Sequence, residues 1–156
     1  APPTHLEQRY RDEINQALAT SVTAVSGIEK SILELTIPFC VASSGSYEKM
    51  QTTLAKTGLL KYFDGLLNST SDVARGKPFP DIYLHAAKKM DVLDPTKCLV
   101  IEDSPLGVQG GVAAGMTVFG YSELMSKKRL IEAGAHHTFN KMDNLINEIN
   151  GFIQTP

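Results

Sequence analysis

The sequence has almost no excess of charge of either sign. Its 15 lysines and arginines nearly balance 17 aspartates and glutamates, which gives a formal net charge of −2. Nucleic acids and anionic membrane surfaces attract proteins that carry clustered positive charge, and this composition offers no such cluster. We therefore expect no nucleic-acid partner.

Long apolar runs and cysteines are also scarce. No apolar run approaches the roughly 20 residues that a membrane-spanning helix needs, so we expect no membrane partner. Residues 1–5 lack the basic flank and apolar stretch of a signal peptide. The two cysteines, Cys40 and Cys98, lie within apolar runs, which is typical of small core side chains in a reducing compartment. The expected location is therefore the cytoplasm.

The chain has enough apolar residues to form a core. Hydrophobic residues make up 42% of its 156 positions, which suits one globular domain. Two stretches near the N-terminus repeat apolar residues at helical spacing and predict helices over residues 4–19 and from residue 28 onward. Their apolar stripes are Leu6, Tyr10, Ile14 and Leu18, then Ile28, Ile32 and Leu35.

From residue 38 onward, short apolar runs alternate with helical patterns. Continuous runs of this kind are typical of strands that are covered on both faces, as in a parallel sheet. The predicted strands are 38–42, 98–101 and 117–120, with weaker candidates at 65–68 and 138–139. The predicted helices are 47–58, 80–90, 105–114 with Ser104 as its N-cap, 127–133 and 143–150. This alternation predicts an α/β fold, a doubly wound (Rossmann-like) parallel sheet with helices on both faces.

Small polar residues follow the first predicted strand. Ligands in such folds bind beyond the carboxyl ends of the strands, where this chain has Ser43, Ser44 and Gly45 before a helix. A glycine-containing turn at a helix N-terminus presents backbone N–H groups to an anion. Ser43 adds a hydroxyl donor, although a serine before a helix is also an ordinary N-cap residue.

Lys77 lies in a loop that prolines stiffen. Pro78 and Pro80 fix their own φ angles on either side of Phe79. A lysine on a rigid loop can neutralise a phosphoryl oxygen, whereas most lysines face solvent. The prolines favour the phosphoryl-binding interpretation of Lys77, and Arg75 is interpreted as a surface or substrate-edge residue.

Two adjacent carboxylates, Glu102 and Asp103, directly follow the predicted strand at 98–101. Neighbouring carboxylates at the end of a buried strand repel each other and lose hydration. A hard divalent cation compensates both effects, and magnesium usually takes one or two protein carboxylates and completes its shell with water and phosphate. The doublet therefore predicts a Mg²⁺ site. A helix cap at Asp103 or Ser104 would explain Ser104 but not the doublet.

These stretches resemble motifs of the haloacid dehalogenase-like (HAD) hydrolase superfamily, and most of all its sugar-phosphate phosphatase and β-phosphoglucomutase branch. Residues 41–46 resemble the second motif of the family, residues 76–83 the third and residues 100–108 the fourth, in the family's order. The likeness covers residues 26–149.

The resemblance implies a role for each residue of the predicted site. Ser43 and the Ser44 amide would hold the transferring phosphoryl group, and Lys77 would stabilise its charge. Glu102 and Asp103 would hold magnesium, with Asp103 favoured as the direct ligand. The substrate would be a small phosphorylated metabolite, with a sugar phosphate as the family's usual choice.

The resemblance also implies a division of the chain. Residues 1–24 would be a remnant of a helical cap domain that closes over the site and selects the substrate. Residues 25–156 would form the α/β core, without its first strand.

One part of the family's pattern has no match in this sequence. Family members begin with a strand and Asp-x-Asp, whose first aspartate is the nucleophile that forms a phosphoaspartate and whose second is the general acid/base. The only aspartate before Ser43 is Asp12, which lies in a predicted helix. The missing strand would be central, so both neighbouring strands would have open edges. We therefore expect this chain to be part of a longer protein, inactive by itself, with an open edge that allows self-association.

Two further functions use the same residues. A phosphomutase shares all of these motifs, and a phosphate-binding protein without the nucleophile would bind but not turn over. Phosphatases form the broader class, so a magnesium-dependent phosphatase is the preferred prediction. A phospho-acceptor receiver domain has its acidic pair first and its lysine last, and the order here is the reverse.

Overall fold

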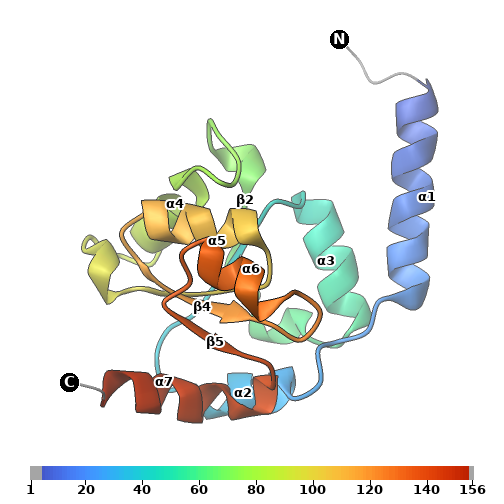
Figure 1. Ribbon diagram of the computed structural model, residues 1–156. Coiled ribbons are helices and arrows are strands. Elements are labelled where there is room, and N and C mark those ends of the chain that lie inside the picture. The colour runs from blue at the N-terminus through green and yellow to red at the C-terminus, as the bar shows by residue number, and fades with distance from the viewer. Residues whose placement is uncertain (1–4, 155–156) are drawn as a thin grey trace.

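The computed structural model describes residues 5–154 of the chain (Figure 1). Two helices come first, α1 (His5–Ser21) and α2 (Ile28–Glu34), and both correspond to predicted helices. Thr4, where the prediction began the first helix, lies outside the described residues.

The strands form two parallel sheets. One sheet pairs β1 (Val41–Ser43) with β2 (Leu67–Ser69), and the other has the order β3 (Leu99–Glu102), β4 (Thr117–Tyr121), β5 (His137–Phe139). Every pairing in residues 5–154 is parallel, which confirms the α/β prediction. The largest error in a strand boundary is at the first strand, which was predicted at 38–42. Pro38 has no N–H to donate, and the ladder begins where the Val41 N–H donates to the Leu66 carbonyl at 2.9 Å.

Helices cover both faces of these sheets, as predicted. One face carries α4 (Asp81–Lys89), α5 (Pro105–Ala113) and α6 (Lys127–Glu132), while α2 and α7 (Leu145–Ile153) lie side by side on the other (Figure 1). Short 3₁₀ turns complete the connections: η1 (Leu60–Tyr62), η2 (Thr70–Asp72), η3 (Pro95–Lys97) and η4 (Met142–Asn144). In the described part of the chain, no helix is long and apolar enough to cross a bilayer.

The edges of β1 and β3 that face away from their partners are unpaired within residues 5–154. The Val41 N–H points to β2, so the backbone groups of Ala42 point the opposite way. The Ala42 carbonyl accepts a hydrogen bond from the Lys77 side chain instead of from a strand. This arrangement agrees with the prediction of a sheet without its central strand. Self-association through these edges stays a prediction.

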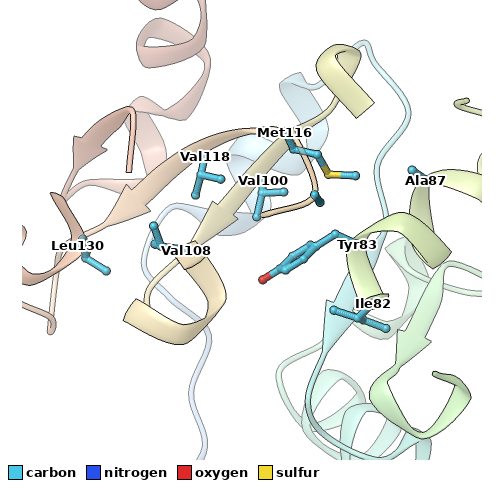
Figure 2. Close-up of a cluster of buried hydrophobic side chains, with 9 residues drawn as sticks. Ile82, Tyr83, Ala87, Val100, Val108, Met116, Val118 and Leu130 are labelled. Atoms are coloured by element: carbon cyan, nitrogen blue, oxygen red, sulfur yellow. The ribbon is translucent and has the colours of Figure 1, made fainter. Parts of the chain in front are cut away.

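The core joins the two sheets through α4. Ile82, Tyr83 and Ala87 of α4 belong to one buried cluster with apolar side chains of β3, β4 and α5, and Figure 2 shows the Tyr83 ring pointing toward Val108. The residues of this cluster that are buried are Ile82, Tyr83, Ala87, Val100, Val108, Ala114, Met116, Val118 and Leu130. A second cluster on the other face contains Phe119, Tyr121, Phe139, Met142 and Leu145. Because α4 contacts β1, β2 and α5, it fixes both strand ends relative to one another.

The first helix, α1, stands apart from this core and lies alongside α3 (Tyr47–Lys56) (Figure 1). Leu6, Tyr10 and Ile14 share one face of α1 by their spacing, and all three are exposed. The assignment of residues 1–24 to a cap and 25–156 to the core stays a prediction.

Candidate functional site

Ser43 and Ser46 both lie near the start of α3, and only one of them caps the helix. Ser46 is the N-cap of α3, and its hydroxyl oxygen accepts from the Lys49 N–H at 3.2 Å. Ser43 is therefore not the cap. Its hydroxyl oxygen accepts from the Gly45 N–H at 3.0 Å, and within residues 5–154 its own proton has no acceptor. Ser43 thus keeps a hydrogen-bond donor for a ligand.

The carbonyl groups of this loop are held by the turn after β2. The Ser69 hydroxyl donates to the Gly45 carbonyl at 2.7 Å, and the Thr70 hydroxyl donates to the Ser44 carbonyl at 3.2 Å. Ser69 is buried, whereas Ser44 is exposed. With its acceptors bound on one side, the loop is fixed in place and presents Ser44 to solvent.

Lys77 connects the two strand ends. Its ammonium group donates to the Ala42 carbonyl at 3.3 Å, one residue before Ser43, and forms an ion pair with the Glu102 carboxylate. The Lys77 side chain is 11% exposed. The lysine that sequence reasoning interpreted as functional is therefore not a solvated surface residue.

Interactions of Arg75 also stabilise the loop that carries Lys77. The Arg75 guanidinium donates to Asp81 at 2.8 and 3.3 Å, and its carbon lies 4.3 Å from the centre of the Phe79 ring. The hydrogen bond from Arg75 lowers the pKa of the Asp81 carboxyl below its usual range. Arg75 is exposed and bound to its own loop, so it stiffens the loop from the outside.

Glu102 is surrounded by donors of this chain. It is only 8% exposed, and Lys77 and the Tyr83 hydroxyl both contact its Oε1, the latter at 2.7 Å. The Ser104 hydroxyl contacts Oε2 at 3.1 Å. Sequence reasoning attributed compensation of this buried charge to a metal. Within the chain the Lys77 ammonium pairs with this charge, and the predicted metal-ligand role of Glu102 stays a prediction.

Tyr83 and Gly107 belong to the site and were not assigned to it from the sequence. The Tyr83 hydroxyl also lies 2.9 Å from the Gly107 carbonyl, and a Cβ atom at Gly107 would overlap the Glu102 carboxyl group. Burial, followed by the negative charge of Glu102, raises the pKa of Tyr83 strongly. A buried tyrosine needs a partner for its hydroxyl, but the burial of Tyr83 is visible only in the structure, so the sequence held no separate signal for it.

Asp103 differs from Glu102 in its exposure and in its contacts. Its carboxylate is exposed and has no hydrogen bond or ion pair with the residues that the structure describes. Within residues 5–154, no group of three or more His, Cys, Asp or Glu side chains is arranged so that it could hold a metal ion. A single exposed carboxylate beside the predicted phosphoryl-binding residues fits magnesium, which keeps several waters, better than metals that need a full set of protein ligands.

A comparison with protein families shows the family of the chain. The model described as "haloacid dehalogenase-like hydrolase" matches residues 3–115. The chain belongs to the haloacid dehalogenase-like hydrolases. The resemblance inferred from the motifs around Ser43, Lys77 and Glu102 is thereby confirmed at the level of the family.

Several known HAD proteins are similar to this chain. The 6-phosphogluconate phosphatase of Escherichia coli K12 is 38% identical over 116 residues, which are 74% of this chain and 52% of the relative. A HAD-like protein of unknown function from Agrobacterium tumefaciens superposes with a TM-score of 0.89 at 31% identity, over 98% of this chain and 72% of its own. A HAD family hydrolase from Deinococcus radiodurans, solved with bound phosphate and sodium, gives 0.83 at 28% identity, over 97% and 69%. The chain thus spans about half the length of the curated E. coli relative.

Proposed function

We propose that this chain forms the phosphoryl-binding and metal-binding part of a magnesium-dependent phosphatase that acts on a small phosphorylated metabolite. The observation that carries the proposal is the position of the Lys77 ammonium, which bridges Ala42 beside Ser43 and Glu102 beside Asp103. A cation between two strand ends, with a free hydroxyl on one side and a free carboxylate on the other, matches the charge distribution of a phosphate–magnesium pair. The similarity to a 6-phosphogluconate phosphatase supports a sugar phosphate as the substrate class.

Each residue then has one task. The Ser43 hydroxyl and the Ser44 amide bind phosphoryl oxygens, and Lys77 neutralises their charge. Asp103 is the direct magnesium ligand, and Glu102 lies behind it and holds Lys77 in place. Bound magnesium would supply Lewis-acid stabilisation of the phosphoryl charge.

The nucleophile is a separate part of the proposal. The Asp-x-Asp motif that supplies the nucleophile of family members has no match in this sequence. We infer that the whole protein uses an aspartate from sequence outside these 156 residues, and that this chain alone binds phosphate without turnover. A phosphomutase would use the same residues, and no observation on this chain favours it over a phosphatase.

Calorimetric titration of the chain with inorganic phosphate tests the site without requiring turnover. We expect binding that depends on magnesium, because the metal and Lys77 together offset the charge of the anion. An absence of phosphate binding with saturating magnesium would contradict the proposed function.

Replacement of Asp103 by asparagine should weaken magnesium binding by about tenfold or more, since contact between unit charges near a protein surface contributes about 1–4 kcal/mol. Titration of Asp103→Asn with MgCl₂ measures this loss. Asp64→Asn is the matched control, because Asp64 is also exposed but lies before β2, away from Ser43 and Lys77. Equal magnesium affinity of the two variants would exclude Asp103 as the ligand.

A further inference from the structure

We propose that the Tyr83 hydroxyl is a positioning group, which sets the place of the Lys77 ammonium through Glu102. The proposal rests on the proposed function only where it concerns phosphate affinity; the positioning itself is a property of the folded chain.

The Tyr83 ring is fixed independently of Glu102. Tyr83 is 4% exposed and reaches from α4 into the core toward the helix that carries Val108 (Figure 2). A Cβ atom at Gly110 would lie 2.8 Å from Cε2 of the ring, so α5 approaches the ring closely because residue 110 is glycine. The hydroxyl oxygen therefore has a position that packing determines.

One carboxylate oxygen transmits this position to Lys77. Oε1 of Glu102 contacts both the Tyr83 hydroxyl and the Lys77 ammonium, while Oε2 is held by Ser104. The ammonium also lies 5.2 Å from the centre of the Tyr83 ring, within cation–π range. Because Glu102 is buried, loss of the hydroxyl removes one of the two donors to a carboxylate oxygen that lies away from bulk solvent. Loss of the hydroxyl should therefore let the carboxylate and the ammonium move together.

A second buried tyrosine, Tyr121, offers a control that distinguishes the positioning role of Tyr83 from ordinary core packing. Tyr121 is 7% exposed, and its hydroxyl donates to the Glu123 carboxylate at 2.7 Å, in the other core cluster. Tyr121→Phe and Tyr83→Phe each keep a ring and remove one hydroxyl–carboxylate hydrogen bond. Tyr83→Phe should lose more stability than Tyr121→Phe in urea denaturation, because Glu102 is buried whereas Glu123 is exposed and can bind water instead.

The deciding measurement is the NMR signal of the Lys77 ammonium in the ¹⁵N-lysine-labelled chain, assigned by its absence in Lys77→Arg. We expect Tyr83→Phe, and not Tyr121→Phe, to shift this signal and to speed its hydrogen exchange. With magnesium present, Tyr83→Phe should also weaken binding of inorganic phosphate by about three- to tenfold, the size of one net hydrogen bond.

The outcomes distinguish the two proposals. A Lys77 signal that responds equally to both tyrosine variants, or to neither, overturns the positioning role. A signal that responds to Tyr83→Phe alone supports positioning even where the unaltered chain binds no phosphate, and that second result would count against the proposed function instead. Unchanged phosphate affinity of Tyr83→Phe in a chain that binds phosphate overturns the proposal that the position of Lys77 matters for binding.

Discussion

Replacement of Lys77 by methionine should abolish most phosphate binding and destabilise the chain at the same time. The variant keeps a long side chain but removes the ammonium that contacts Ala42 and Glu102. Glu102 is then a buried charge without its counter-ion, and removal of one partner of such a pair typically costs about 3–5 kcal/mol. Urea denaturation measures that loss. Calorimetry should show phosphate affinity reduced by about ten- to hundredfold, because hydrogen bonds to charged groups contribute about 1.5–3 kcal/mol.

Two further variants divide these effects. Lys128→Met removes an exposed lysine from its pair with Glu132 and should change stability by less than about 1 kcal/mol. In Lys77→Met/Glu102→Gln the buried carboxylate is also neutral, so the double variant should be more stable than Lys77→Met but bind phosphate as weakly. A Lys77→Met protein that matches Lys128→Met in stability and phosphate affinity would remove Lys77 from the site.

The sequence was sufficient to predict the fold because local patterns of residues indicate each strand and helix. The runs at 98–101 and 117–120 match β3 and β4 to within one residue at each end. The residues of both strands are buried or half-buried, as the continuous apolar runs indicated. Strand ends were less predictable, because they depend on which backbone groups find a partner. The Val41 N–H has the Leu66 carbonyl as an acceptor, whereas Pro38 has no N–H to donate.

The sequence indicated which strand ends carry the candidate site, but not which of its side chains pair with one another. Parallel strands bring their carboxyl ends to one edge, so Ser43 and Glu102 were expected at the site from topology alone. The partner of Glu102 was not, because Lys77 lies 25 residues away in the chain and reaches it from a loop. Composition and spacing show that a charge needs compensation but not which distant side chain provides it.

Serine capping shows a second limit of sequence reasoning. Ser43 and Ser46 are both plausible caps for α3 by composition, since each is a serine just before the helix. The structure gives the cap to Ser46, through its bond to Lys49, and so releases Ser43. The choice depends on the conformation of Gly45 and Ser44 between them, which residue type alone does not determine.

Replacement of Gly107 by alanine should destabilise the chain although alanine is the better helix former. In an open helix interior this change stabilises by up to about 1 kcal/mol. Here the new Cβ would overlap the carboxyl group of Glu102, which must then leave Lys77 and Tyr83. Overpacking and a broken buried pair together predict a net loss of about 2–4 kcal/mol in urea denaturation.

The matched control for Gly107 is Gly151, which lies within α7, where an added Cβ atom would meet open space among the residues that the structure describes. Gly151→Ala should therefore gain stability where Gly107→Ala loses it. If the Glu102 carboxyl group is the obstacle, Gly107→Ala should cost less in a Glu102→Ala background than in the native one, because the space is then empty. Equal costs in both backgrounds, or a gain for Gly107→Ala in the native chain, would show that glycine at 107 is not required by Glu102. The expected non-additivity would instead identify Gly107 as the residue that lets a buried carboxylate lie against a helix and hold Lys77.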